Sequence, residues 1–549
     1  MSNLDDTKTS VEKLKAEGNA FHTQGHLEDA ILKYTEAIQL DQGNAILYAN
    51  RSASHLSMKN YLDAACDARQ AVVIDPSYTK AWARLAKATH ALWQYDQSIK
   101  AWKRALETLP VISVSQLSPT DAHFKQQFEE GLKAAEDAHA RQVSGESSNP
   151  HLVSMNDPSK MPWNRAMALM PELERTQTAD SSAWVIVPAY REFNEGVQAM
   201  KALRLLPNRS AYGHYGALAD ITNGILRDRR VFHMDGANWL DQYRNQREFA
   251  FEITQSGAWV DGGVEHAKRQ AENTLREKGW DTARKALAIT VRSWFMRAFL
   301  EEGARRNARV ATQFYGSALT LLEWGQTKWR DVSRDDRGAI FENTFVRGVR
   351  RYYLSAYLMG VKDHGDGSVY TLDRAEALAL AMVKEVSDNW PRGNEEYVQD
   401  RGFYYSFVVY PRAEAYSTLG FVNMERAHAC RGTDPETAMR YYSAAAEWYL
   451  KAAESYPEDD EFHFYFLKIA FEACWHRADP IRDILPLCQP MQEALQKMRA
   501  IWEFSSNKGT MNEHVQQLIY FNEGVFTGLI SKLYTLDTPS SLVALHKPE

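Results

Sequence analysis

The sequence predicts an all-α protein with an N-terminal solenoid of three helix pairs and a capping helix, followed by a large α-helical domain. Two observations support this fold class. Within the first 110 residues, similar residues recur at steps of 34 positions. In most of the remaining chain, apolar residues recur at helical intervals, and few segments show the alternation that is typical of strands.

The repeat is defined by small residues, which recur where two helices must approach closely. Three series step by 34 positions: Ala30, Ala64 and Ser98; Ala37, Ala71 and Ala105; and Gln42, Pro76 and Pro110. Large residues such as Tyr34 and Trp102 fill the space between helices, and proline ends the second helix because it lacks an amide donor. We therefore predict helix-turn-helix units at about 11–44, 45–78 and 79–112, within a domain spanning 8–142.

The segments after the third unit are assigned from composition and periodicity. Residues 118–142 have an apolar stripe that predicts a capping helix over the last unit. Residues 143–160 are rich in Ser, Asn, Pro and Gly, which predicts a linker. Residues 161–535 form the predicted α-helical domain, and 536–549 a partly disordered C-terminal tail.

The second domain is expected to contain degenerate copies of the same unit. Two helical stretches carry small and large residues at the offsets of the first domain, namely Ala311, Tyr315 and Ala318, and Ala445, Tyr449 and Ala452. The best candidate for an extended segment is SAWVIVPAY, 182–190, although its length also permits the start of a helix.

One face of the predicted solenoid gathers donor side chains. Asn50 and Arg84 are 34 residues apart, so they occupy the same place on the first helices of consecutive units. Lys80 lies four residues before Arg84, and Lys15 four before Asn19, so each pair shares a helix face. The spacing resembles that of the tetratricopeptide repeat, and this resemblance implies that the first helices line a concave groove. Lys15, Asn19, Asn50, Lys80 and Arg84 thus converge on one channel, which suits paired carboxylates such as those at an acidic peptide C-terminus.

The stretches AEGNAF, DAILKYTEAIQLD, YANRSAS and KAWARLAKA resemble the tetratricopeptide repeat, and the resemblance covers residues 11–110. The five donors are similar to the carboxylate clamp of chaperone-binding tetratricopeptide domains. This resemblance implies docking of the Glu-Glu-Val-Asp tail of the seventy- or ninety-kilodalton heat-shock chaperones. It also implies possible peptide contacts at His22 and Ala53. Arg51, beside Asn50, is expected to turn toward the neighbouring helix and take no part in the groove.

Composition restricts the class of protein. The formal net charge of −7 is ordinary for 549 residues and does not indicate nucleic-acid binding. Four scattered cysteines, Cys66, Cys430, Cys474 and Cys488, favour a reducing compartment over a disulfide scaffold. We find no leader pattern and no apolar stretch long enough for a membrane span, so we expect a cytoplasmic or nucleocytoplasmic protein without a membrane partner.

Candidate catalytic and metal-binding patterns are weak. His233-Met234-Asp235 matches the His-x-Asp pair of iron(II) oxygenases, but those enzymes place the pair on a sheet, and a turn is the better interpretation. Cys474 and His476 point apart on a helix, so an inert core cysteine is expected. We predict no catalytic residue, no metal and no cofactor.

The function expected from these patterns is that of a non-enzymatic chaperone-binding adaptor. Its clamp would hold a chaperone tail, and its second domain would bind an unknown client or complex subunit. Two alternatives remain at this stage: an enzyme with an unfamiliar helical C-terminal domain that the repeats recruit to chaperones, or a scaffold whose groove binds another acidic peptide.

Overall fold

The computed structural model describes residues 2–110, 118–143, 157–205, 211–236, 238–253, 259–365, 367, 369–389 and 400–545. These residues are almost entirely helical, which confirms the predicted all-α class; the two named strands, β1 and β2, form one short antiparallel hairpin. The chain divides into two compact units, one of residues 1–150 and 251–338 and one of residues 151–250 and 339–549.

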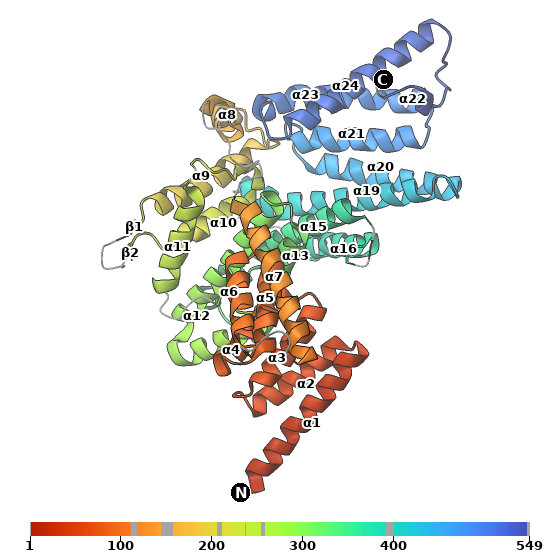
Figure 1. The fold of residues 1–549 in the computed structure, drawn as a ribbon. Helices are drawn as coiled ribbons and strands as arrows, with labels where there is room; N and C mark the ends of the chain where they lie inside the picture. The colour runs from red at the N-terminus through yellow and green to blue at the C-terminus, as the bar shows by residue number, and fades with distance from the viewer. Residues whose placement is uncertain are drawn as a thin grey trace. The chain divides into compact units, whose positions relative to one another are not determined.

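Unit 1 contains the predicted solenoid. Its helices are α1 (Ser2–Gln24), α2 (Leu27–Leu40), α3 (Ala45–Ser57), α4 (Tyr61–Ile74), α5 (Thr79–Ala91), α6 (Tyr95–Glu107), α7 (Pro119–Val143), α12 (Val264–Gly303), α13 (Ala308–Lys328) and α14 (Arg334–Arg337). Helices α1 to α6 pack as three successive pairs, and α7 packs on α6 (Figure 1). The predicted fold class of three helical pairs with a capping helix is therefore confirmed.

The repeated small residues lie where the helices of each pair meet. All six alanine and serine residues of the first two series are completely buried. Gly18 allows the ring of Tyr34 to lie directly against α1, because a Cβ at that position would lie 2.7 Å from the ring. In the same way, Gly131 of α7 lies against the ring of Trp102 on α6, which explains how the capping helix covers the last pair.

Unit 1 also includes a helical pair from much later in the chain. The kinked helix α12, which bends at Gly279 with φ of 76°, and helix α13 pack against each other, and α12 contacts α4. Arg297 on α12 donates to the Leu92 carbonyl oxygen at 2.9 Å, and Arg69 on α4 donates to that of Asp261 at 2.7 Å. The structure therefore groups 251–338 with the solenoid, whereas the sequence placed this segment in the second domain.

The α12–α13 pair is built like the N-terminal pairs. Ala311, Tyr315 and Ala318 of α13 are all completely buried, as their offsets predicted. Gly263, the residue before α12, lies close to Asp63 on α4; a Cβ at Gly263 would lie 2.8 Å from the Cα atom of Asp63. A glycine is therefore needed here for the close approach of the two segments, although its own φ of −77° is ordinary.

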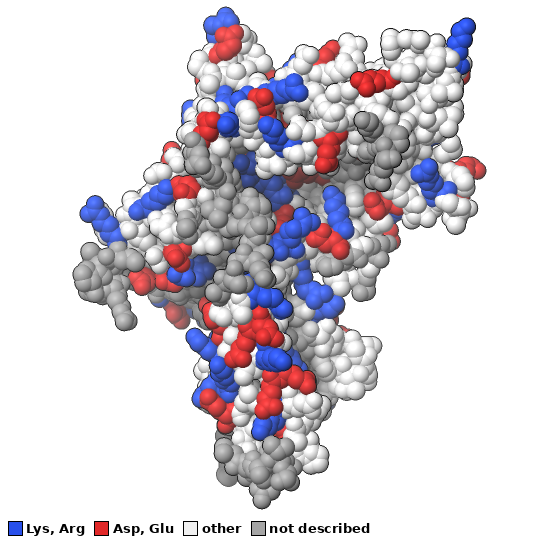
Figure 2. Space-filling model, turned by 45° about the horizontal axis from the view of Figure 1, so that its top comes forward, with Lys and Arg blue, Asp and Glu red and all other residues white. Residues whose placement is uncertain are grey.

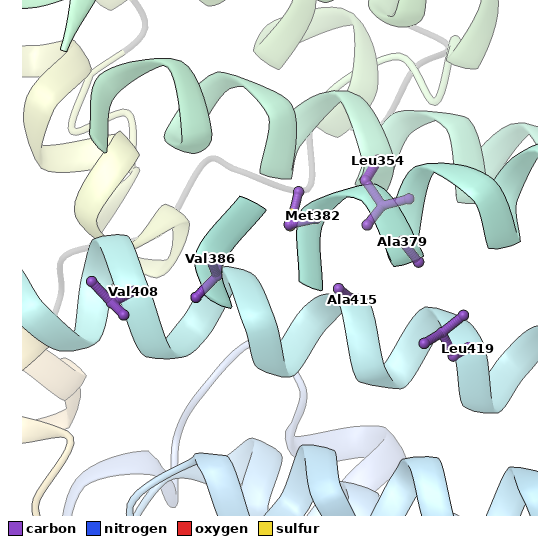
Figure 3. Close-up of a cluster of buried hydrophobic side chains, with 7 residues drawn as sticks. All are labelled: Leu354, Ala379, Met382, Val386, Val408, Ala415 and Leu419. Carbon is purple, nitrogen blue, oxygen red and sulfur yellow. The ribbon is translucent and has the colours of Figure 1, made fainter. Parts of the chain in front are cut away.

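Unit 2 is a second helical array. Its elements are η2 (Pro158–Lys160), α8 (Pro162–Arg175), α9 (Ala183–Lys201), β1 (Arg204–Leu205), β2 (Ala211–Tyr212), α10 (Ala217–Arg227), η3 (Arg229–Val231), α11 (Trp239–Ile253), η4 (Ala339–Phe341), α15 (Asn343–His364), α16 (Leu372–Asp388), α18 (Arg401–Tyr404), η5 (Tyr405–Val409), α19 (Tyr410–Cys430), α20 (Pro435–Ser455), α21 (Glu461–His476), α22 (Ile481–Ile484), η6 (Leu485–Leu487), α23 (Cys488–Trp502), α24 (Lys508–Ile530) and η7 (Ser540–Leu542). Figure 3 shows apolar side chains of α15, α16, η5 and α19 meeting in one of its core clusters.

The structure decides two predictions about unit 2. Of the two interpretations of the segment 182–190, an extended piece or the start of a helix, the structure shows the second: apart from its first residue the segment lies in α9, and its apolar run is largely buried. The C-terminal segment is ordered from 536 to 545: the amide of Ser540 donates to the Asp479 carbonyl oxygen at 2.8 Å, and Val543 is buried. The predicted linker, 143–160, falls mostly outside the described residues.

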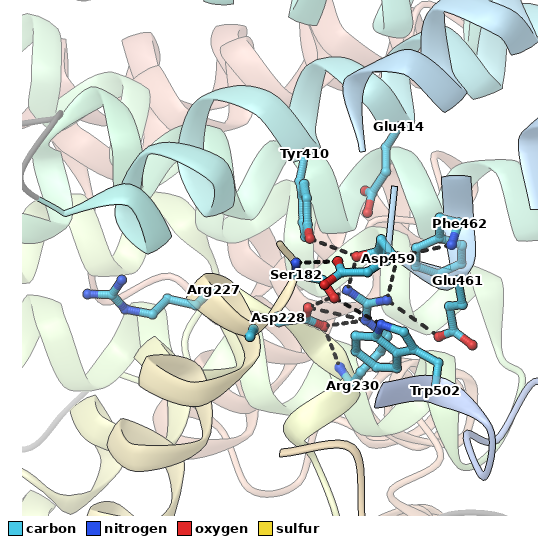
Figure 4. A network of polar contacts seen from close by, with 12 residues as sticks. Ser182, Arg227, Asp228, Arg230, Tyr410, Glu414, Asp459, Glu461, Phe462 and Trp502 are labelled. Carbon is cyan, nitrogen blue, oxygen red and sulfur yellow. Dashed lines mark hydrogen bonds and ion pairs between the residues drawn. The ribbon is translucent and has the colours of Figure 1, made fainter. Parts of the chain in front are cut away.

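A buried ion network holds several parts of unit 2 together (Figure 4). The Arg230 guanidinium donates to both carboxylate oxygens of Asp460, at 2.8 and 2.9 Å, and to those of Asp228, the shortest bond being 2.7 Å. Its Cζ atom lies 3.8 Å from the centroid of a Trp502 ring. Although burial alone would lower the pKa of Arg230, the carboxylates of Asp228 and Asp460 raise it overall. The network joins η3 to α21 and α23 by charge and by ring contact.

Candidate peptide-binding site

The five predicted clamp residues lie on the first helix of each pair. Lys15 and Asn19 are on α1, Asn50 is on α3, and Lys80 and Arg84 are on α5. Helix α3 contacts both α1 and α5, so these three helices lie side by side. The structure brings Asn19 and Asn50 into direct contact, since the Nδ2 atom of Asn50 donates to the Oδ1 atom of Asn19 at 3.1 Å.

The oxygen of Asn19 accepts a second hydrogen bond from below the groove. The hydroxyl of Tyr34, on α2, donates to Asn19 Oδ1 at 2.7 Å. The ring of Tyr34 is 2% exposed, whereas Asn19 is exposed. Both asparagines are thus held by hydrogen bonds, and among the described residues none of these bonds uses the amide nitrogen of Asn19.

Arg84 is the most buried cation of the set. Burial lowers the pKa of its guanidinium, and the nearby hydroxyls of Tyr78 and Tyr34 act in the opposite direction. Its Nη1 atom is buried and has no hydrogen-bond partner among the described residues. A buried guanidinium donor without a partner costs free energy.

The two lysines stand at the edge of the site. Lys80 is exposed, and its Nζ atom lies 5.9 Å from the centroid of the Phe124 ring on α7, the capping helix. Lys15 forms an ion pair with Glu12 at 2.5 Å, one turn earlier on α1. An acidic ligand would therefore compete with Glu12 for Lys15, whereas Lys80 makes no ion pair among the described residues.

The possible contacts predicted beside the clamp lie on α1 and α3. The Nδ1 atom of His22 is 2.9 Å from the hydroxyl oxygen of Ser54, and Ala53, the residue before Ser54, is partly buried. His22 is thereby tied to the helix that carries Asn50. Both side chains remain candidates for contacts with a peptide.

Arg51 turns away from the groove, as predicted. Its Nε and Nη2 atoms donate to the two carboxylate oxygens of Asp67 on α4, at 2.8 and 2.7 Å, and its Nη1 atom donates to Thr35 on α2 at 2.8 Å. Burial opposes the charge of Arg51, but Asp67 raises the pKa of the guanidinium overall. The adjacent asparagine and arginine residues therefore make different contacts: Asn50 bonds to Asn19 on α1, and Arg51 joins three helices.

The role of Tyr34 was missed by reasoning from the sequence, which treated it only as a large residue between helices. The feature that could have revealed this role is the hydroxyl of a tyrosine at a predicted core position, because buried hydroxyls usually find a hydrogen-bond partner. The identity of that partner depends on how α2 packs against α1, which spacing alone does not specify.

The two weaker candidates from the sequence, His233 and Cys474, are buried in the core. His233 is buried, its Nδ1 atom is 2.9 Å from the Val231 carbonyl oxygen, and its ring stacks on Trp163. Burial raises the pKa of the Cys474 thiol to about 11, which leaves little thiolate at neutral pH.

Within the described residues we find no cluster of three His, Cys, Asp or Glu side chains that could hold a metal ion. In the same part of the chain, no helix has the length and apolar character required to cross a lipid bilayer.

Figure 2 shows the charged side chains of one face of the molecule, where acidic and basic residues are interspersed. The view shows no large field of one sign. The mixed charge of this face agrees with the modest net charge of the chain.

Comparison with known proteins finds partial matches of about the size of the N-terminal domain. No model of a known protein family matches the chain. The small glutamine-rich tetratricopeptide repeat-containing protein 2 of Saccharomyces cerevisiae is 43% identical over 102 residues, which are 19% of this chain and 30% of that protein. The heat-shock protein cognate co-chaperone sgt12 of Aspergillus fumigatus is 36% identical over 96 residues, 18% of this chain and 28% of that protein.

Other similar proteins include an enzyme and a peptide complex. The serine/threonine-protein phosphatase 5 of Mus musculus is 29% identical over 158 residues, 29% of this chain and 30% of that protein. The first tetratricopeptide domain of Spaghetti (RPAP3), solved with the HSP90 peptide SRMEEVD, is 28% identical and covers 23% of this chain and 94% of that chain, with a TM-score of 0.20. The chain thus spans less than a third of the length of these three curated relatives.

Proposed function

We propose that this chain, whose N-terminal domain belongs to the tetratricopeptide-repeat co-chaperone family, is an adaptor that binds the acidic C-terminal tail of a heat-shock chaperone. The observation that carries the proposal is the donor set of α1, α3 and α5, in which a buried Nη1 atom of Arg84 has no hydrogen-bond partner among the residues that the structure describes. The curated relatives support it, since one of them is named a heat-shock cognate co-chaperone.

Each side chain of the clamp has a distinct role in this proposal. Arg84 and Lys80 bind carboxylates of the peptide, and Lys15 does so after it leaves Glu12. Asn19 and Asn50 bind the terminal carboxylate and the peptide backbone through amide hydrogens. Hydrogen bonds to charged groups are stronger than neutral ones, so a peptide with two closely spaced carboxylates is favoured over one with a single charge.

The second unit gives the adaptor its other binding partner. A chaperone tail held by unit 1 and a client or complex subunit held by unit 2 would be tethered to one chain. Tethering raises the effective concentration of one partner near the other without any chemical step. We include in the proposal that the protein is not an enzyme and acts in the cytoplasm, where the chaperones of this class are available.

Isothermal titration of the full chain tests the chaperone-binding proposal. The full chain is used because α12 packs on the solenoid, so a fragment ending near residue 143 would expose part of α4. The titrants are a peptide ending in Glu-Glu-Val-Asp and the same peptide with an amidated C-terminus. We expect binding of the free acid that is greatly weakened by amidation. Equal binding of both peptides would exclude a clamp for a terminal carboxylate, and no binding by the folded protein would exclude the chaperone tail as the ligand.

A further inference from the structure

The Asn19 amide has two possible orientations, and only one of them suits an anionic ligand. With the nitrogen facing the groove, Asn19 offers two N–H donors to a carboxylate. With the oxygen facing the groove, it would place a negative end of the amide dipole against that carboxylate. A clamp that depends on Asn19 therefore needs a device that selects the first orientation.

The contacts of Asn19 provide such a device. Its Oδ1 atom accepts from the Tyr34 hydroxyl at 2.7 Å and from Asn50 Nδ2 at 3.1 Å. A carbonyl oxygen has two lone pairs, so these two bonds use its accepting capacity and turn the nitrogen away from Tyr34.

The Tyr34 hydroxyl is the donor in this bond. An amide oxygen only accepts hydrogen bonds, so the proton between the two atoms comes from the hydroxyl. Burial raises the pKa of Tyr34, and the charge of Arg84 opposes that effect.

The hydroxyl occurs in the first repeat and in neither of the next two. The positions 34 and 68 residues after Tyr34 are Ala68 and Trp102, neither of which has a hydroxyl group. Gly18, the residue before Asn19, permits the ring to lie directly beneath α1. Tyr34 therefore belongs to the same repeat as Asn19, which lies on the first helix of that repeat.

We propose that Tyr34 is a positioning residue of the peptide site: its buried hydroxyl holds the Asn19 oxygen below the groove and turns both amide hydrogens toward the terminal carboxylate of the peptide. This inference rests on the proposed function, because it assigns Tyr34 a role in binding the same acidic tail. Tyr34 itself does not touch the peptide and acts only through Asn19.

The test is a double-mutant cycle on the full chain, titrated with the Glu-Glu-Val-Asp peptide as free acid and as amide. Tyr34→Phe retains the ring that packs on Gly18 and removes only the hydroxyl. We expect it to raise the Kd for the free acid roughly fivefold to tenfold, the effect of one hydrogen bond. Binding of the amide should change little, so the ratio of the two Kd values should fall.

The second arm of the cycle separates positioning from general structural support. In an Asn19→Ala background the hydroxyl has nothing to orient, so Tyr34→Phe should add less than a roughly twofold change in Kd. The matched control is Tyr315→Phe on α13, which also removes a buried hydroxyl, one that donates to Glu302 at 3.2 Å. It should lower the melting temperature and leave the Kd unchanged.

The outcomes distinguish this inference from the proposed function. If the wild-type protein prefers the free acid but Tyr34→Phe binds the free acid as tightly as the wild type, the role assigned to Tyr34 is wrong, and the proposed function is unaffected. The same is true if Tyr34→Phe weakens binding as much with Asn19→Ala as without it. If the folded wild-type protein does not bind the free acid, both the function and the role of Tyr34 are wrong.

Discussion

Arg51 and Asp67 face each other across α3 and α4 in a two-point ion pair, with donor–acceptor distances of 2.8 and 2.7 Å. Arg51 is 4% exposed and Asp67 6%, so the pair is separated from solvent. The pair joins α3, which also carries Asn50, to α4, so the stability of the repeat can be tested separately from the proposed peptide site.

Replacing Arg51 by Ala should destabilise the protein strongly. The substitution leaves the Asp67 carboxylate buried without its partner, and the loss of one member of a buried pair costs about 3 to 5 kcal/mol. Urea unfolding followed by circular dichroism measures the change. The control is Arg104→Ala, which removes an exposed pair with Glu107 and should have little effect. A loss of less than about 1 kcal/mol for Arg51→Ala would contradict the structural role assigned to the pair.

The clamp cations should contribute to peptide binding and not to folding. We expect Lys80→Ala and Arg84→Ala each to weaken binding of the free-acid peptide by about 1.5 to 3 kcal/mol, the range for hydrogen bonds to charged groups. Isothermal titration measures the loss. Lys103→Ala, which removes a cation that pairs with Glu136 on α7, is the matched control and should bind normally. If Lys80→Ala, Arg84→Ala and Lys103→Ala all bind like the wild type, the groove is not the peptide site.

Asp63 should make unit 1 less stable as the pH rises. Burial raises the pKa of its carboxyl to about 7, with the charges of Asp67 and Glu265 adding to the effect. Below about pH 4 the group is protonated in the folded and unfolded states alike. Between about pH 4 and pH 7 the unfolded chain gains stability by releasing the proton, while the folded protein resists doing so. The contribution of Asp63 to folding is therefore lost over this window and stays low above it.

Asp63→Asn tests that sign, because an amide oxygen can still accept the hydrogen bond from Val264 that the carboxyl accepts. Relative to the wild type, the variant should be more stable at pH 8, by up to about 4 kcal/mol at roughly 1.4 kcal/mol per pKa unit, and the difference should shrink at pH 5. Thermal unfolding at the two pH values measures it. The exposed Asp96→Asn is the control, for which we expect little change at either pH. A benefit that is larger at pH 5 would contradict the sign.

Arg230 should be essential to the folding of unit 2. Arg230→Met removes the charge that Asp228 and Asp460 share and leaves two buried carboxylates uncompensated, which we expect to cost about 3 to 5 kcal/mol. Near-ultraviolet circular dichroism is a suitable probe because Trp502 packs on the guanidinium. Arg440→Ala breaks an exposed pair within α20 and serves as the control. Unchanged thermal unfolding of Arg230→Met would show that the network is not needed for stability.

Much of the first unit could be predicted because its information is local. The 34-residue period relates each helix to its sequence neighbours, so the burial of Ala30, Ala64 and Ser98 follows from spacing alone. The same spacing places Asn50 and Arg84 on corresponding faces, and the turn of Arg51 toward α4 follows from its being next to Asn50 on the helix.

Long-range packing accounts for the features that were missed. The segment 182–190 is compatible with an extended piece and with the start of a helix, because a short apolar run has no period that distinguishes a strand from a buried helix. The tail up to residue 545 looked disordered because its order depends on Asp479, about sixty residues earlier in the chain.

The sequence by itself determined the three helical pairs, their capping helix and the five donors on the first helices, because these depend on helix periodicity and on contacts between consecutive elements. The tertiary structure alone decided that α12 and α13 join the first unit, that Arg230 meets Asp460, and that Tyr34 holds the oxygen of Asn19. The physical reason is that hydrogen bonds and ion pairs require specific atoms within about 3 Å, and a sequence pattern indicates a face or a register without locating those atoms.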